Sequence, residues 1–243
     1  VPIPTHGRGL PSMLEPLEQL ETGHRIVPGQ WVADRASKDP YAAREGEKII
    51  YFTHGGGYFI CSSDTHREML WRISRATGRR IFAVDYRLAP EHPYPAAVQD
   101  ALHAFLHLTD PNGLGFSPEN VTVSGDSAGG GLAIAMMMYQ RDHGLPMPSK
   151  AILLSPWLDL TMTCESWASD SLDYLPARFN MDHSFNPILF YCSGRDKIKT
   201  LAKHPYLSPL WGNLEGLPPL LIQCGEAERL LDECILFTFK AGG

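Results

Sequence analysis

Short apolar runs recur along the chain, and each is bounded by glycine, proline or polar residues of the kind that form turns. Such runs, rich in β-branched and aromatic side chains, predict buried strands. The predicted strands cover residues 48–53, 80–86, 120–124, 150–155 and 219–224. Each run is too short for a helix of ordinary length, which favours the strand interpretation.

Helical patterns separate these runs. Within residues 98–108, apolar side chains recur at the spacing of one helix face. Further helices are predicted over residues 64–77, 128–143 and 229–240, with Asp64 able to cap the first of them. The alternation of strands and helices predicts an α/β fold with a mostly parallel, doubly wound sheet.

Two segments interrupt this alternation. Residues 1–45 carry proline, glycine and charge without a clear period, and residues 161–205 are rich in aromatic residues, methionine and proline. Both are expected to lie over the sheet as a helical cap that covers the site and shapes its pocket. The predicted organisation is therefore an N-terminal cap segment at 1–45, a core at 46–160, a cap insertion at 161–205 and an incomplete core at 206–243.

Composition excludes several classes of function. The 243 residues carry a formal net charge of −6 with both signs interspersed, so nucleic acid is not expected as a partner. The longest apolar stretch, residues 132–139, is too short to span a membrane, and the first residues do not resemble a secretory signal. The five scattered cysteines form no C-x-x-C pair, which favours free thiols and a cytoplasmic protein.

The strongest chemical motif is a G-x-S-x-G pattern centred on Ser127, directly after the strand at 120–124 and at the start of the helix at 128–143. A serine on such a tight turn has strained backbone geometry, and the flanking Gly125 and Gly129 allow close approach of neighbouring chains. The helix start directs N–H groups and a positive dipole end toward an oxyanion. Ser127 is therefore the predicted nucleophile rather than part of a plain glycine-rich turn.

A second motif, HGGGY at 54–58, follows the strand at 48–53. Consecutive glycines can turn N–H groups inward, so Gly56, Gly57 and the N–H of Ala128 are the predicted oxyanion donors. His54 is expected to brace this loop, and Tyr58 to line the substrate pocket. The alternative without a catalytic role is a flexible loop. Neither glycine segment fits a phosphate-binding pattern.

At these motifs the sequence resembles the hormone-sensitive-lipase family of esterases. The matching blocks are HGGGY at 54–58, DYRLAPEHPYPA at 85–96, GDSAGG at 125–130, SPWLDLT at 155–161 and HPYLSPL at 204–210. The resemblance implies the α/β-hydrolase fold and a serine carboxylesterase of short- to medium-chain acyl esters. It also implies a small-molecule ester substrate, no metal or cofactor, and structural roles for Asp85, Arg87 and Glu91. Oligomeric state stays open.

The same resemblance places the catalytic acid in a D-x-L-x-D pattern after the next strand. Here that pattern aligns Glu228 with its first position and Asp232 with its last. Glutamate serves as the third triad member on this fold, so Glu228 is preferred over Asp232. Asp159 and Asp196 are expected to be structural or solvated.

The triad order on this fold is serine, acid, histidine, yet all ten histidines precede Glu228. His183 and His204 are the nearest alternatives, one in the predicted cap and one in a structural block. The expectation is that a final strand, the histidine loop and a last helix are missing, so that the chain as given is nearly inactive.

Two other functions compete with the esterase. One is a non-catalytic small-molecule-binding module, because the plant gibberellin receptors resemble the same family without its working histidine. The other is an amide-cleaving deacetylase of similar fold. Hydrolysis of matched ester and anilide substrates separates the enzymes, and tight binding without turnover indicates a receptor.

Overall fold

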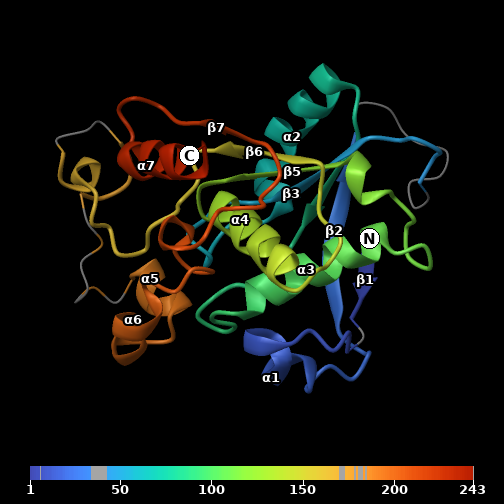
Figure 1. The fold of residues 1–243 in the computed structure, drawn as a ribbon, viewed down its shortest axis with the longest axis horizontal. Helices are drawn as coiled ribbons and strands as arrows, with labels where there is room; N and C mark the ends of the chain where they lie inside the picture. Colours follow the sequence, from blue (N-terminus) through green and yellow to red (C-terminus); the bar gives the residue numbers. More distant parts are fainter. Residues whose placement is uncertain are drawn as a thin grey trace.

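The computed structural model describes residues 1–5, 7–33, 43–169, 173–177, 179, 183 and 185–242. Within them one twisted sheet has the strand order β1-β2-β4-β3-β5-β6-β7 (Figure 1). Its strands are β1 (Pro2–Pro4), β2 (Ile26–Val32), β3 (Ile49–Thr53), β4 (Ile81–Val84), β5 (Val121–Asp126), β6 (Lys150–Leu154) and β7 (Leu220–Gln223). The strands β4, β3, β5, β6 and β7 run parallel to one another, which confirms the predicted α/β class.

The α-helices of the described residues lie between the strands or after the last one. They are α1 (Glu15–Glu18), α2 (Ser63–Thr77), α3 (Ala96–Thr109), α4 (Ser127–Asp142), α5 (Pro187–Tyr191), α6 (Arg195–Leu201) and α7 (Leu231–Gly242). The five predicted strands and four predicted helices are confirmed within a few residues. None of the helices in the described ranges is long and apolar enough to cross a membrane.

The segment before residue 45 differs in part from its prediction as covering material. Residues 26–32 form β2, which pairs antiparallel with β4 and so belongs to the sheet itself. Strand β1 pairs with β2 in turn and extends that edge. The pattern analysis missed β2 because Pro28 and Gly29 interrupt it, and both residues are rare inside strands. The division into cap and core segments stays a prediction.

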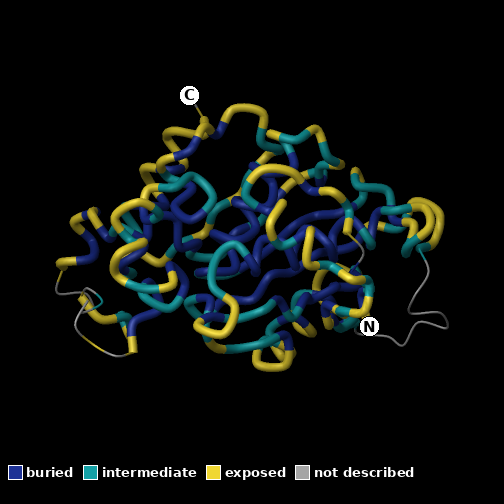
Figure 2. The backbone as a smooth tube through the Cα atoms, turned by 90° about the horizontal axis from the view of Figure 1, so that it is seen from below, coloured by how far each residue is buried: buried dark blue, intermediate teal, exposed yellow. Residues whose placement is uncertain are grey.

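Alternation along the central strands builds two cores, one on each face of the sheet. Ile50 and Phe52 of β3 pack with Leu70 of α2 on one face. Tyr51, between them in sequence, faces the opposite core, which contains Phe105 of α3 and the buried residues of α4. Figure 2 shows this buried interior as a continuous dark-blue band with exposed residues around its rim. The period of two expected of strands therefore fixes which helix lies on which face.

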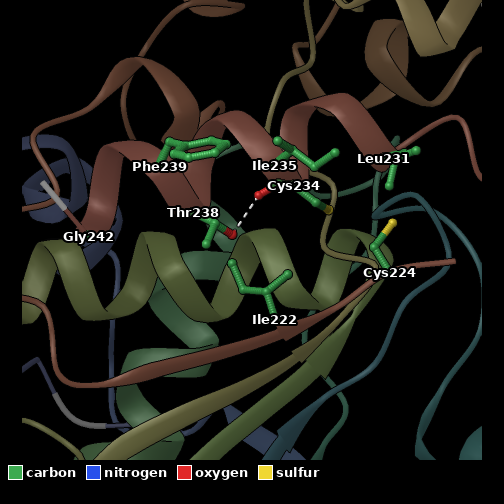
Figure 3. Close-up of a pocket in the computed structure, with 8 residues that line it drawn as sticks. All are labelled: Ile222, Cys224, Leu231, Cys234, Ile235, Thr238, Phe239 and Gly242. Carbon is green, nitrogen blue, oxygen red and sulfur yellow. Dashed lines mark hydrogen bonds between the residues drawn. The ribbon is translucent and has the colours of Figure 1, made fainter. Parts of the chain in front are cut away.

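The other edge of the sheet is β7, on which α7 lies. Figure 3 shows a groove between them, a cavity of about 600 Å³ lined mostly by apolar side chains. Its lining residues are Ile222, Cys224, Leu231, Cys234, Ile235, Thr238, Phe239 and Gly242. All five cysteines are free thiols, and three of them are buried.

Candidate active site

The register of the parallel strands brings the two glycine motifs together. Thr53 at the end of β3 pairs with Gly125 near the end of β5, so both strands end at the same edge of the sheet. Ligands of open α/β sheets bind at this carboxyl edge. The loop that begins at His54 and the turn that carries Ser127 therefore start side by side.

Ser127 occupies a strained turn between β5 and α4. Its φ of 49° lies in the left-handed region, which a residue with a side chain adopts only when its surroundings demand it. A Cβ on Gly125 would lie 2.6 Å from the Thr53 hydroxyl, and one on Gly129 would overlap the Thr53 carbonyl. The flanking glycines are thus required by close backbone approach, as the motif predicted.

The start of α4 supplies the electrostatic part of this site. Ser127 is the first residue of this 16-residue helix, and Ala128 follows in its first turn. The N–H groups of a first turn have no partner within the helix, and the helix dipole places partial positive charge there. An oxyanion beside Ser127 would therefore meet donors that are already oriented.

The glycine loop is bonded directly to this turn. The Gly55 N–H donates to Asp126 Oδ1 at 2.9 Å, and a Cβ on Gly55 would overlap the Asp126 carboxylate. Gly56 and Gly57 have φ values of 115° and 60°, conformations that favour glycine. The two predicted oxyanion donors of the loop thus follow a residue that is held next to Ser127.

Side chains brace the loop from behind, as predicted for His54. Its ring stacks on Tyr86 with centroids 4.3 Å apart, and Tyr86 donates its hydroxyl proton to the His54 carbonyl at 2.6 Å. Burial lowers the pKa of His54, which keeps the ring neutral near pH 7. Asp85 accepts the Ser63 N–H, and Arg87 pairs with Asp100, both structural contacts in keeping with the prediction.

A cavity of about 680 Å³ opens in front of Ser127. Its lining residues are Met69, Asp126, Ser127, Leu154, Ser155, Asp173, Tyr174, Leu175, Gly225, Glu226, Ala227, Glu228 and Leu230. The predicted nucleophile and the predicted acid Glu228 thus share one cavity. The structure does not bring Tyr58 into its lining: that ring is buried and stacks on Tyr191 with centroids 3.9 Å apart.

The two candidate acids differ in what they bind. Glu228 is half-buried, and its Oε1 accepts the Gly225 N–H at 2.9 Å, within the loop that follows β7. Asp232 lies in the first turn of α7, where its Oδ2 accepts the Ser166 N–H at 2.7 Å. The Asp232 carboxylate therefore joins α7 to the segment after β6, which favours Glu228 as the acid that faces the cavity.

The remaining candidates lie outside this cavity. Asp159 is buried and accepts bonds from the side chains of Thr163 and Trp211, a structural role as predicted. His183 is exposed, and its ring accepts the Phe185 N–H at 3.0 Å. His204 packs beside Tyr94, and burial lowers its pKa. None of the histidines that the structure describes lines the cavity with Ser127.

Two residues near the site were not predicted from the sequence. His66 Nε2 lies 3.3 Å from Asp126 Oδ2, in the residue before the predicted nucleophile. Glu233 is buried in α7 and accepts the N–H groups of Leu158 and the Trp167 indole. No local spacing identifies either residue, because each contact joins segments far apart in the sequence.

Comparison with known proteins gives the same picture. Residues 49–240 match a protein family described by the α/β hydrolase fold. An acetyl-hydrolase of Streptomyces hygroscopicus is 38% identical over 191 residues, which are 79% of this chain and 60% of that protein. An esterase of Acinetobacter venetianus is 36% identical over 206 residues, 82% of this chain and 63% of that protein. The chain thus spans about three fifths of these relatives' length.

Solved structures agree with the sequence relatives. A crystal structure of EstE5 soaked with p-nitrophenyl butyrate superposes with a TM-score of 0.71 at 42% identity, covering 89% of this chain and 67% of that one. An esterase described as belonging to the bacterial hormone-sensitive lipase family has a TM-score of 0.73 at 38% identity, with the same coverage.

Proposed function

Because this chain belongs to the hormone-sensitive-lipase branch of the α/β-hydrolase superfamily, we propose that it carries the nucleophile, oxyanion donors and acid of a serine carboxylesterase. One observation carries the proposal. Ser127 stands at φ 49° on the turn between β5 and α4, while the neighbouring Asp126 is bonded to the glycine loop. This arrangement exposes a hydroxyl group beside backbone donors, as acyl transfer requires.

In the proposed reaction the Ser127 hydroxyl oxygen attacks the ester carbonyl carbon and forms an acyl-enzyme. The N–H groups of Gly56, Gly57 and Ala128 stabilise the negative charge on the carbonyl oxygen. The imidazole of a triad histidine, which none of the described histidines supplies in this cavity, would take the hydroxyl proton and pass it to the departing alcohol, and Glu228 is the proposed group that orients it. Water then attacks the carbonyl carbon of the acyl-enzyme, and the imidazole takes a proton from this water. The bond to the Ser127 oxygen breaks, the imidazole returns the proton to that oxygen, and the carboxylic acid leaves.

The cavity supports small esters as substrates. Met69, Leu154, Leu175 and Leu230 contribute apolar side chains to its lining. Apolar walls accept the acyl chain of a small ester, and the cavity of about 680 Å³ has the size of a small-molecule site. We therefore propose short- to medium-chain acyl esters, in agreement with the p-nitrophenyl butyrate used to soak the related EstE5 crystal.

The test uses the full gene product with two substrates that share a butyryl group. Hydrolysis of p-nitrophenyl butyrate is expected to be much faster than hydrolysis of the matched p-nitroanilide. Faster cleavage of the anilide would instead identify an amide-cleaving enzyme. Binding of small esters without turnover by the folded protein would contradict the enzyme proposal and favour a binding module.

A further inference from the structure

The Asp126 carboxylate lies between two groups from different parts of the fold. Its Oδ1 accepts the Gly55 N–H at 2.9 Å. The His66 Nε2 lies 3.2 Å from Oδ1 and 3.3 Å from Oδ2. His66 belongs to α2, Gly55 follows β3, and Asp126 is the last residue of β5. One carboxylate therefore joins a helix, the glycine loop and the turn that carries Ser127.

The second ring nitrogen of His66 also faces acceptors. Nδ1 lies 3.1 Å from the Ser62 carbonyl oxygen and 2.9 Å from the Thr65 hydroxyl. Thr65 has a single hydroxyl proton, and it donates this proton to the same Ser62 carbonyl at 2.7 Å. A neutral ring with a bare Nδ1 would direct its lone pair at the Ser62 oxygen. The surroundings of both nitrogens therefore favour the imidazolium form.

The charges around the ring point the same way. The Asp126 carboxylate raises the pKa of His66 through its hydrogen bond and its charge. His54 is the nearest ring, at 5.8 Å between centroids, and burial lowers its pKa, so it adds little repulsion as a neutral group. Asp85 binds Ser63 at the start of α2. The first turn of a helix disfavours a cation, so the charge on His66 depends mainly on Asp126.

We propose that His66 is a positioning residue of the esterase site. As an imidazolium it holds the Asp126 carboxylate on the Gly55 N–H, and so keeps the donors of the glycine loop aligned with Ser127. Its effect on turnover rests on the proposed esterase function, whereas its ionisation does not. The Asp126 side chain is 26% exposed, so without the cation it can turn toward water and release Gly55.

The kinetic test replaces the cation. In His66→Gln, kcat for p-nitrophenyl butyrate is expected to fall about 10- to 100-fold with little change in KM, because displacement by about 1 Å already costs about 100-fold. His66→Lys restores a positive charge and should recover part of this loss. His24→Gln, an exposed histidine outside the cavity lining, is the matched control.

A double-variant comparison tests the route through Asp126. If His66 acts through that carboxylate, then His66→Gln combined with Asp126→Asn should be no slower than Asp126→Asn alone. The proposal would be overturned if the fold-losses in kcat of the two single variants multiplied in the double variant. An unchanged kcat in a folded His66→Gln variant would also overturn it, because a purely structural histidine would lower only the melting temperature.

Nitrogen NMR of the His66 ring decides the ionisation without any assay of turnover. At about pH 6.5, where a free imidazole is half protonated, both ring nitrogens should carry protons in the unaltered protein. Asp126→Asn should lower the pKa of His66. The His66–Asp126 pair stabilises the folded protein when the pH is below the pKa of a free imidazole. This stabilisation is lost as the pH rises through the raised pKa of His66 in the folded protein. The difference in melting temperature between the unaltered protein and His66→Gln should therefore become smaller as the pH rises from about 6 to about 9.

These measurements separate the two proposals. A His66 ring that is mainly neutral at about pH 6.5 would overturn the positioning role, whatever the esterase assay shows. If the ring is an imidazolium but the unaltered protein does not hydrolyse esters, the esterase proposal fails, and with it the role of His66 in turnover. An imidazolium together with a selective loss of kcat supports both.

Discussion

Asp126 accepts the Gly55 N–H at 2.9 Å, so the residue before the candidate nucleophile is bonded directly to the glycine loop. This bond joins β5 to the segment after β3, two elements about 70 residues apart in the sequence. A carboxylate that accepts a backbone N–H forms a strong bond, because the acceptor is charged. The candidate nucleophile and the loop that carries two of the proposed oxyanion donors are therefore held as one unit.

The oxyanion assignment predicts a large effect at Gly57, whose φ is 60°. A valine there would twist the loop, and its Cβ would lie 3.1 Å from the Phe59 ring. Loss of one oxyanion donor costs about 100- to 1000-fold in turnover, so Gly57→Val should lower kcat by this factor and change KM less. Steady-state kinetics with p-nitrophenyl butyrate measures both parameters.

Gly78 provides the matched control for that variant. It also has a positive φ, at 67°, but it ends α2 and a Cβ there would meet no atom within 4 Å. Gly78→Val should therefore strain the backbone without changing kcat. Equal kcat values for the two folded variants would show that the N–H groups of the loop do not stabilise the reaction.

The acid assignment predicts unequal effects at two carboxylates. Glu228→Gln should leave the fold intact but orient the imidazole poorly, a change that costs about 10,000-fold in a related triad. Asp232→Asn should cost far less activity, because Asp232 binds the Ser166 N–H rather than facing the cavity. Comparison of kcat/KM for both variants tests the assignment. A larger loss for Asp232→Asn would transfer the acid role to that residue.

Glu233 is predicted to be a structural anchor. Its carboxylate accepts N–H groups from Leu158, Asp159 and the Trp167 indole, and the residue is completely buried. Each buried donor left without a partner costs about 1 to 3 kcal/mol, so Glu233→Ala should destabilise the protein by at least about 3 kcal/mol. Urea unfolding measures this change.

Glu226 offers a control for the unfolding experiment. It is an exposed glutamate in the loop before α7, so Glu226→Ala should change the free energy of unfolding by less than about 0.5 kcal/mol. A similarly small change for Glu233→Ala would mean that its hydrogen bonds contribute nothing net to stability.

The central strands could be predicted because their whole pattern is local. All five residues of β3 are buried, and all are apolar or aromatic except Thr53. The Thr53 hydroxyl is within donor distance of the Ser124 and Gly129 carbonyl oxygens. Strand β2 could not be predicted, because its Gly29 is required by a contact with a distant residue. A Cβ on Gly29 would overlap the Phe82 ring of β4.

The same distinction between local patterns and contacts with distant residues applies to the candidate site. The Ser127 turn and its glycines could be predicted because the strained turn, the preceding strand and the following helix are contiguous in the sequence. The roles of His66 and Glu233 could not be predicted, because each residue contacts a partner more than about 50 residues away in the sequence. Periodicity reports which face of an element is buried, but it does not report which carboxylate meets which donor.

The most direct measurement of the central claim is covalent labelling of Ser127 in the full gene product. A fluorophosphonate ester reacts with a serine that an adjacent base activates, and peptide mass mapping then locates the adduct. The account predicts an adduct on the peptide that contains Ser127, a loss of ester turnover in proportion to labelling, and no adduct at that site in Ser127→Ala. An adduct confined to another residue, or full ester turnover in folded Ser127→Ala, would contradict the account.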